Sequence, residues 1–331
     1  MKGMIISRFG RTDARRGGGI YRTAKLSSEA LKKNGFHIDE IADKLDHYKV
    51  DEHNFIWIYT GDFIQISDRI LNNIDPTDIP LIINSGWVPD VNRERWMIET
   101  LERYILKFPN LIFNTWTHQA KQIIEDNNKK LRNKIVYLPH IQNINSNLPV
   151  KPFIERKGVC IGELGKIQRV SLSSFSPNLL IDKLVEKGFK EDIFTYGQYA
   201  EENRKLRKIV KIIPKQDQLS FFETMSNLRA IVWLTDKETF AAPPLELAQL
   251  GVIPILPNMP QSLNQYVETS TKFKDENDAA EMIINLLDEQ KFKSEQHETL
   301  KKIRKIKKEI LQNDFYKQIK EIISTKPRGY I

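Results

Sequence analysis

Hydrophobic and polar positions alternate along the chain in blocks that predict strands and helices in turn. Short apolar runs rich in β-branched residues indicate buried strands, and longer runs with apolar residues every three or four positions indicate helices. In the first half, strands are predicted in GMIISRF near the start and at 54–61, 81–87, 111–116 and 134–139. Helices are predicted at 20–35, ending at Gly35, and at 92–108 and 117–131.

The alternation stops at 140–158 and then begins again. This stretch is polar, rich in asparagine and twice interrupted by proline, which is typical of a linker. Strands are predicted beyond it at 159–164, 192–197, 209–214, 230–235 and 251–257, with helices between them. We therefore expect an α/β protein with two Rossmann-like domains, whose parallel sheets face a central ligand cleft. The expected boundaries are 1–145, 155–295, and 296–331 for C-terminal helices that pack back toward the first domain.

Length and composition fit this organisation. The chain has 331 residues, which exceeds the size at which a single core usually stops growing. Its 40% hydrophobic and 28% charged residues are those of a globular protein. Cys160 is the single cysteine, which excludes a disulfide framework and a thiolate metal cluster and favours a reducing compartment. The N-terminus lacks the apolar region of a signal peptide, and no run approaches the roughly 20 apolar residues of a membrane span. A cytoplasmic protein, soluble or peripheral at the membrane, is expected.

The net charge of +8 favours an anionic partner. Six of the positive charges lie in KKIRKIKK at 301–308, where Leu300, Ile303, Ile306 and Ile310 recur at helical spacing. The plainest interpretation is a solvated basic face over a buried apolar stripe. The alternative is contact with an anionic membrane surface, and nucleic acid is the less favoured partner.

The stretch ETFAAPPLELAQLGVIPIL at 238–256 carries the most specific chemistry. It follows a predicted strand and contains a helix of about two turns that begins near Pro243 and ends at Gly251. The free N–H groups at the start of this helix suit a phosphate. Glu238 and Glu246 offer carboxylate oxygens that accept hydrogen bonds from vicinal hydroxyls. Phosphates flanked by two polyols describe a nucleotide-sugar.

This stretch resembles the glutamate, seven residues, glutamate motif of retaining GT-B glycosyltransferases of the family 4 type. Both glutamates match, together with Phe240, Pro243 and Gly251. KIVYLPHIQN, VCIGELGK and PILPNMPQSLNQYV resemble further segments of that family, so the resemblance covers most of the chain. It implies a GT-B fold and retaining transfer from a nucleotide-sugar without a metal or other cofactor.

The resemblance also implies roles for single residues. Glu238 would hold hydroxyls of the donor sugar and is the candidate catalytic residue, while Glu246 would bind the ribose. The backbone amides of Thr239, Phe240 and Ala241 would lie near the sugar and the diphosphate. Gly18 and Gly19, in a predicted glycine loop, would let the backbone of the first domain approach the donor.

Two departures from the family pattern concern the donor site. Thr239 and Ala241 replace the glycines of the family motif, and each adds a Cβ beside the expected sugar. Glu163 stands where the family has an arginine that clamps the diphosphate. Lys166 and Arg169 lie nearby and are the candidate replacements for that clamp.

Other conspicuous residues have plainer interpretations. Arg15 and Arg16 are candidates for an anionic acceptor, but a flexible basic loop explains them as well. Trp87 fits a core position or a sugar-stacking surface. His118 and His140 have no partners at metal-ligand spacing, so we expect structural roles for both.

The sequence as a whole predicts a glycosyltransferase that uses a nucleotide-sugar and a glycan or lipid-linked acceptor, of the kind that builds bacterial cell-surface polysaccharides. Two alternatives keep the fold. A glycosyltransferase that modifies DNA would bind duplex DNA with strong salt dependence. A non-catalytic binding subunit, suggested by Glu163, would bind a nucleotide or a partner without turnover.

Overall fold

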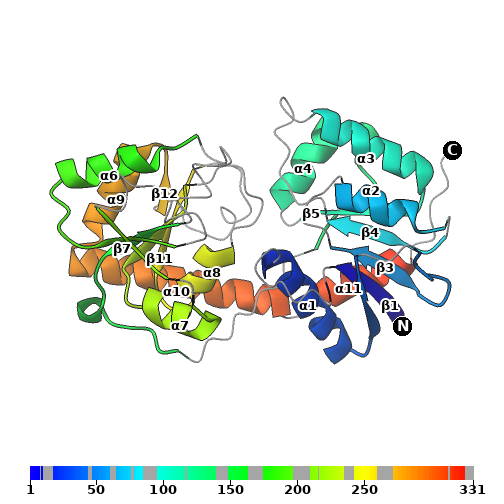
Figure 1. Cartoon of the computed structure of the whole chain (residues 1–331), viewed down its shortest axis with the longest axis horizontal. Helices are drawn as coiled ribbons and strands as arrows, with labels where there is room; N and C mark the ends of the chain where they lie inside the picture. The colour runs from blue at the N-terminus through cyan, green and yellow to red at the C-terminus, as the bar shows by residue number, and fades with distance from the viewer. Residues whose placement is uncertain are drawn as a thin grey trace. The chain divides into compact units, whose positions relative to one another are not determined.

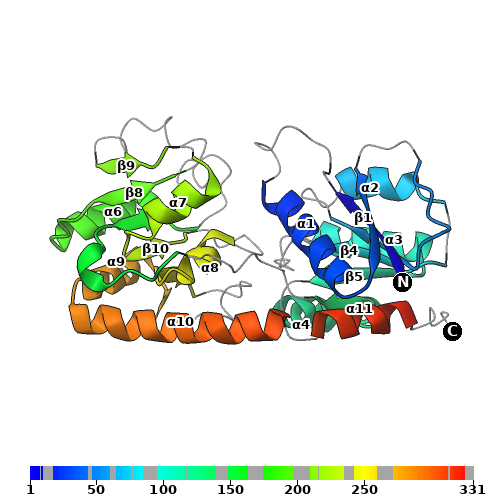
Figure 2. The same cartoon turned by 90° about the horizontal axis from the view of Figure 1, so that it is seen from below.

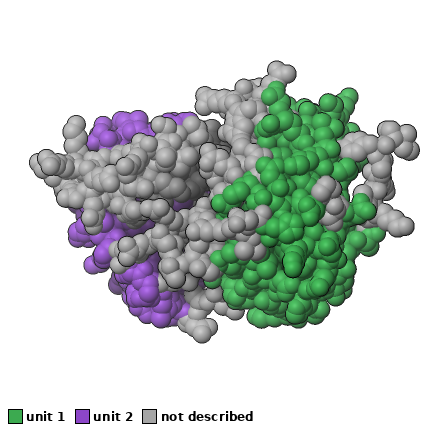
Figure 3. Space-filling model, turned by 45° about the vertical axis from the view of Figure 1, so that its right-hand side comes forward, with its two compact units in different colours: residues 1–142, 309–331 green, residues 143–308 purple. Residues whose placement is uncertain are grey.

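The computed structural model describes two compact units within the chain. The described residues are 1–7, 9, 18–43, 47–59, 65–75, 78–84, 95–115, 118–138, 148–162, 174–196, 209–214, 216–234, 242–258, 271–311 and 314–324. Unit 1 comprises residues 1–142 and 309–331, and unit 2 comprises residues 143–308 (Figure 3). The chain therefore enters unit 2 once and returns to unit 1 near its C-terminal end.

Unit 1 is built on a six-stranded parallel sheet with the order β2-β1-β3-β4-β5-β6 (Figure 1). Its strands are β1 (Lys2–Ser7), β2 (His37–Ala42), β3 (Phe55–Ile58), β4 (Leu81–Asn84), β5 (Leu111–Thr115) and β6 (Ile135–Tyr137). Five of these strands were predicted from the apolar runs, and β2 was not. Parallel strands need helical crossovers, which place helices on both faces of such a sheet.

The helices of unit 1 form a layer on each face of its sheet. They are α1 (Gly18–Lys33), α2 (Gln65–Asn72), α3 (Arg95–Lys107), α4 (His118–Asn127) and α11 (Asp314–Ser324), with a short 3-10 turn, η1, at Lys129–Leu131. One layer is α2, α3 and α4, and the other is α1 and α11 (Figures 1 and 2). The predicted single helix at 117–131 is wrong at Asn128. This residue is extended (φ −145°), and its side chain accepts from the Lys130 N–H at 3.0 Å, which starts η1 instead.

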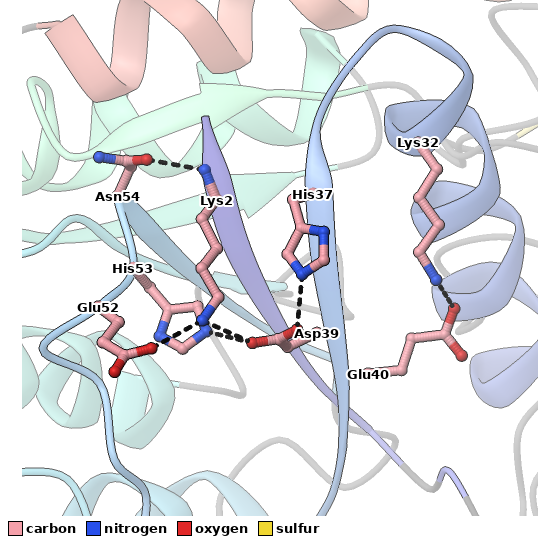
Figure 4. A network of polar contacts seen from close by, with 8 residues as sticks. All are labelled: Lys2, Lys32, His37, Asp39, Glu40, Glu52, His53 and Asn54. Carbon is pink, nitrogen blue, oxygen red and sulfur yellow. Dashed lines mark hydrogen bonds and ion pairs between the residues drawn. The ribbon is translucent and has the colours of Figure 1, made fainter.

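Strand β2 is held at the edge of the sheet by ionic contacts on both of its sides (Figure 4). Toward α1, the carboxylate of Glu40 accepts from Lys25 (2.9 Å), Ser28 (2.7 Å) and Lys32 (2.8 Å). Toward β1 and the residues before β3, Asp39 contacts the ring of His53 at 2.8 Å and the amine of Lys2 at 3.3 Å. These contacts let a strand with two acidic residues, HIDEIA, join the sheet.

The Glu40 contacts predict a loss of stability in acid. Burial raises the pKa of Glu40, but the hydrogen bonds from Lys32, Ser28 and Lys25 outweigh it and lower the pKa to about 2. Because the folded-state pKa lies below the ordinary value of 4.5, the stabilisation is present above pH 4.5 and disappears as the pH falls toward 2. The two lysines are partly exposed, so we expect Glu40 to contribute about 1–2 kcal/mol to the free energy of unfolding at neutral pH.

Urea unfolding of wild type and Glu40→Gln at pH 7 and at pH 3 measures this contribution. The variant should be less stable at pH 7, and the gap should narrow at pH 3. Glu29→Gln removes an exposed carboxylate from α1, the helix that supplies the partners of Glu40, and serves as the control. An equal gap at both pH values contradicts the assignment.

Unit 2 repeats the architecture with a second six-stranded parallel sheet of order β12-β11-β10-β7-β8-β9. Its strands are β7 (Val159–Ile161), β8 (Ile193–Thr195), β9 (Val210–Ile212), β10 (Ala230–Val232), β11 (Ile253–Pro257) and β12 (Lys272–Phe273). Its helices are α6 (Pro177–Glu186), α7 (Gln218–Met225), α8 (Ala242–Ala248), α9 (Glu276–Asn285) and α10 (Glu289–Leu311), with a 3-10 turn, η2, at Phe153–Glu155. α6 and α9 cover one face of the sheet, and α7 and α8 cover the other (Figure 1).

The two helix stops predicted at glycines are confirmed. Gly35 and Gly251 both have the left-handed backbone that glycine adopts most readily, with φ of +81° and +72°. After α8, Val252 N–H donates to the Leu247 carbonyl at 3.2 Å, which closes the six-residue turn of a Schellman cap. A Cβ at Gly251 would also meet Val150 and Gln296 at 2.8 Å.

A buried arginine ties together the ends of two helices in unit 2. Arg156 is fully buried, and its guanidinium donates to the carbonyls of Lys151 (2.9 Å), Leu228 (2.9 Å) and Leu250. Leu228 and Leu250 lie just beyond the C-terminal ends of α7 and α8, where unpaired carbonyls and the negative end of the helix dipole favour a cation.

A second arginine, Arg229, lies in the same region of unit 2. Its guanidinium pairs with the Glu191 carboxylate at 3.0 Å and stacks on the ring of Phe153 at 3.9 Å from the centroid.

No described helix is long and apolar enough to cross a membrane.

Candidate functional site

The order in which the chain adds strands to the parallel sheet of unit 2 reverses between β7 and β10. From β7 the chain proceeds outward to β8 and β9, and it then returns to the other side of β7 with β10, β11 and β12. β7 and β10 are hydrogen-bonded neighbours, with Val159 opposite Ala230 and Ile161 opposite Val232. Ligands of open α/β sheets bind at the carboxyl ends of strands at such a switch point.

The segments that carry the predicted donor-site residues continue from these two strands. Lys166 and Arg169, with Glu163, follow β7 in the chain, and Glu238, Thr239, Phe240 and Ala241 follow β10. All seven lie outside the described residues. The described strands place the starting points of both segments side by side, at the edge where a ligand is expected.

Tight packing supports the ends of these strands. The Gly162 N–H donates to the Val232 carbonyl at 3.0 Å, and the Gly162 carbonyl accepts from the Thr195 hydroxyl at 2.7 Å. A Cβ on Gly162 would lie 2.9 Å from the ring of Trp233, so only glycine fits beside this indole. Thr195 and Trp233 were not singled out from the sequence, because their part depends on strand neighbours that only the fold reveals.

Glu246 is the one predicted donor-site side chain that the structure describes. It lies in α8, between the buried residues Leu245 and Leu247, and is itself only 6% exposed. α8 is the helix that connects β10 to β11, so Glu246 belongs to the same region of the unit as the switch point.

Unit 1 has its own switch point, between β1 and β3. Gly18 and Gly19 are the first two residues of α1, the helix that follows β1. The prediction of a glycine loop is therefore wrong for these two residues, because the helix starts two positions earlier than its apolar pattern. His118 is the first residue of α4. Arg15, Arg16, Trp87 and His140 lie outside the described residues.

The described residues contain little that suggests nucleophilic or metal chemistry. Cys160 is fully buried in β7, and burial raises the pKa of its thiol well above the ordinary value. A neutral, inaccessible thiol is a poor nucleophile. Within the described part of the chain, no three histidine, cysteine, aspartate or glutamate side chains come together as metal ligands.

Comparison with known proteins identifies the fold. No family model and no curated protein matches the sequence. Sucrose-phosphate synthase from Thermosynechococcus elongatus is similar in structure, with a TM-score of 0.68 and 13% identity over 97% of this chain and 99% of that chain. The Anabaena protein HepE in complex with UDP-glucose gives a TM-score of 0.66 and 11% identity over 98% and 99%.

A third neighbour is a mutant of S. aureus TarM in complex with fondaparinux, alpha-GlcNAc-glycerol and UDP. Its TM-score is 0.62, with 10% identity over 82% of this chain and 55% of that chain, so this chain spans about half of TarM. These likenesses establish the fold. The chain has the GT-B fold, with two six-stranded parallel sheets, and the fold class expected from its sequence is confirmed.

Proposed function

We propose that this chain is a glycosyltransferase that takes its sugar from a nucleotide-sugar donor. The main support is that the two segments with the candidate donor residues continue from β7 and β10, which are adjacent strands at the switch point of unit 2. α8, the helix that carries Glu246, connects β10 to β11 and so places this residue in the same part of the unit. The GT-B fold, and neighbours bound to UDP or UDP-glucose, favour this chemistry over other uses of an α/β sheet.

In the proposed reaction the protein positions the substrates and stabilises charge. Glu238 accepts hydrogen bonds from the donor sugar, Glu246 holds the ribose hydroxyls, and Lys166 and Arg169 neutralise the leaving diphosphate. The bond between the anomeric carbon and the phosphate oxygen breaks, and an acceptor hydroxyl oxygen bonds to that carbon. The acceptor proton passes to the departing phosphate on the same face, so the anomeric configuration is retained and no metal is needed.

The proposed division of labour follows the two domains. The N-terminal domain, 1–145, binds the acceptor, and the C-terminal domain, 155–295, binds the donor. The acceptor is a glycan or a lipid-linked glycan of the kind found in cell-surface polysaccharide synthesis. We place the protein in the cytoplasm, at the inner face of the membrane, where the exposed Lys301, Arg304 and Lys305 of α10 suit an anionic surface.

A thermal-shift panel of UDP, GDP, ADP, TDP and CMP in excess EDTA tests the donor site. A ligand at about a hundred times its dissociation constant adds about 2.7 kcal/mol of stability, which raises the melting temperature by several degrees. We expect one nucleotide, with UDP first among the candidates, to give such a shift without metal. The absence of a shift from all five would contradict the proposal.

A further inference from the structure

Leu106, near the C-terminal end of α3, is an exposed leucine on the surface of unit 1. It is 81% exposed, whereas the neighbouring Tyr104 and Ile105 are buried in the core. A single exposed leucine is common and needs no explanation by itself. Leu106 differs from such a residue because its surroundings are strongly basic.

Two segments supply the basic residues around Leu106. Arg103 and Lys107 are its neighbours on α3, and both are exposed. The second segment is 128–134, NKKLRNK, which contains η1 and carries four cations, Lys129, Lys130, Arg132 and Lys134. The first three of these are exposed, and the fourth is half-buried.

Hydrogen bonds hold the second segment against the end of α3. Asn128 donates to the Glu102 carboxylate at 2.7 Å, and Glu102 lies one helical turn before Leu106 on the same side of the helix. The Lys134 amine donates to the carbonyl of Pro109, three residues after Leu106. These contacts lie before and after Leu106 in the chain, so the segment 128–134 runs beside it.

We call Leu106 and the five exposed cations, Arg103, Lys107, Lys129, Lys130 and Arg132, the basic patch. The segments 99–110 and 128–134 contain six cations and only two carboxylates, Glu99 and Glu102. Glu102 lies 3.7 Å from the Lys130 amine. Lys129 and Arg132 have no ion-pair partner among the described residues. The patch therefore has an excess of positive charge around an exposed apolar side chain.

Helix α10 is also basic, but its described part lacks this combination. The exposed Lys293 and Lys301 are paired with Glu289 at 2.7 Å and with Glu298 at 3.3 Å. None of the large apolar side chains described in α10 is exposed. Both surfaces suit an anionic partner by charge, and the basic patch adds a side chain that favours a non-aqueous one.

We propose that the basic patch docks on an anionic lipid bilayer, with Leu106 inserted among the acyl chains and the five cations at the headgroups. Each cation close to an anionic surface strengthens binding about fivefold, and the leucine gains by leaving water. A polyanion in water, such as nucleic acid, would use the cations but leave the leucine exposed.

This docking surface names the membrane contact of the proposed function. Its setting in the cell therefore rests on that function, because a lipid-linked acceptor is what would bring the protein to a membrane. The binding of the patch to a bilayer does not require sugar transfer, so the two are tested separately.

A fluorophore at residue 106 tests the insertion directly. Cys160 is the single cysteine of the chain and is fully buried, so Leu106→Cys supplies an accessible thiol for an environment-sensitive dye. In the full chain, the emission should shift to the blue with vesicles of phosphatidylglycerol and phosphatidylcholine, and not with phosphatidylcholine alone. Leu219→Cys, at a leucine of α7 that is 58% exposed in unit 2, is the matched control and should not respond.

Vesicle co-sedimentation measures what the cations and the leucine contribute. Lys129→Glu combined with Arg132→Glu should weaken binding to the anionic vesicles about 25-fold or more, and Leu106→Ser about tenfold. Lys33→Glu combined with Lys49→Glu makes the same change in net charge at other exposed residues of unit 1, and it should weaken binding less than fivefold. All these side chains are exposed, so the melting temperatures should stay within a degree or two of wild type.

The inference is overturned if the dye at residue 106 does not respond to anionic vesicles, or if the Lys129 and Arg132 reversals bind like wild type. It is equally overturned if the chain binds duplex DNA and not vesicles, or if Lys301→Glu with Arg304→Glu in α10 abolishes vesicle binding while the patch variants keep it. The UDP thermal shift measured on the same samples reports on the donor site alone, so its absence with intact vesicle binding would count only against the proposed transferase.

Discussion

Replacing Glu238 with alanine is expected to lower glycosyl transfer by about 10²–10³-fold while the melting temperature stays within a degree or two of wild type. The proposed carboxylate orients the donor sugar, and losing one preorganised contact to the reacting group typically has this effect on the rate. Nucleotide binding should change little, because Glu238 is assigned to the sugar and not to the diphosphate.

A substitution at Glu246 distinguishes its proposed role at the ribose from the proposed role of Glu238 at the donor sugar. Glu246→Gln keeps the size of a side chain that is only 6% exposed, and it should weaken nucleotide binding about 10-fold through the ribose. Glu223→Gln, which changes a carboxylate of α7 in the same unit, is the control and should leave both measurements unchanged. Full transfer by Glu238→Ala would remove the catalytic assignment.

Replacing Arg156 with leucine is expected to have the largest effect on stability, a loss of about 3–5 kcal/mol. The substitution leaves three carbonyls, those of Lys151, Leu228 and Leu250, without their donor in a buried place. Burial lowers the pKa of Arg156 to about 10, with repulsion from Arg229 as a second cause, so the guanidinium remains charged at neutral pH.

Urea unfolding measures this loss, provided that the m-value, which is the slope of the unfolding free energy against urea concentration, is the same in the variant and in wild type. Arg156→Lys keeps a positive charge but lacks the forked guanidinium, and it should fall between leucine and wild type. A loss below about 1 kcal/mol for Arg156→Leu would mean that water replaces the guanidinium at the ends of α7 and α8.

The apolar runs predicted the strands that lie inside the two sheets, because a strand buried on both faces is hydrophobic at nearly every position. β2 was not predicted in this way. It lies at a sheet edge and carries Asp39 and Glu40, whose partners Lys2, His53, Lys25 and Lys32 are supplied by other elements. β12 has only two residues, too few for any pattern. The order of strands was likewise hidden, since it is set by packing between segments far apart in the chain.

The candidate site divides in a similar way. The motif at 238–246 is contiguous in the chain, so the sequence alone reveals it. The fold adds that β10, the strand before this motif, pairs with β7, the strand before Lys166 and Arg169. The support from Gly162, Thr195 and Trp233 depends on three separate strands and has no sequence signature.

The central claim is that this chain transfers sugar from a nucleotide-sugar, and release of the nucleoside diphosphate tests it most directly. The donor would carry the nucleotide selected by the thermal-shift panel, and the reaction would contain EDTA and a panel of neutral saccharides as acceptors. We predict diphosphate release that depends on the saccharide, with retained configuration in the product, and its loss in Glu238→Ala. Nucleotide binding with no release from any donor would contradict the claim, and it would identify the chain as a GT-B binding subunit in which Glu163 replaces the diphosphate clamp.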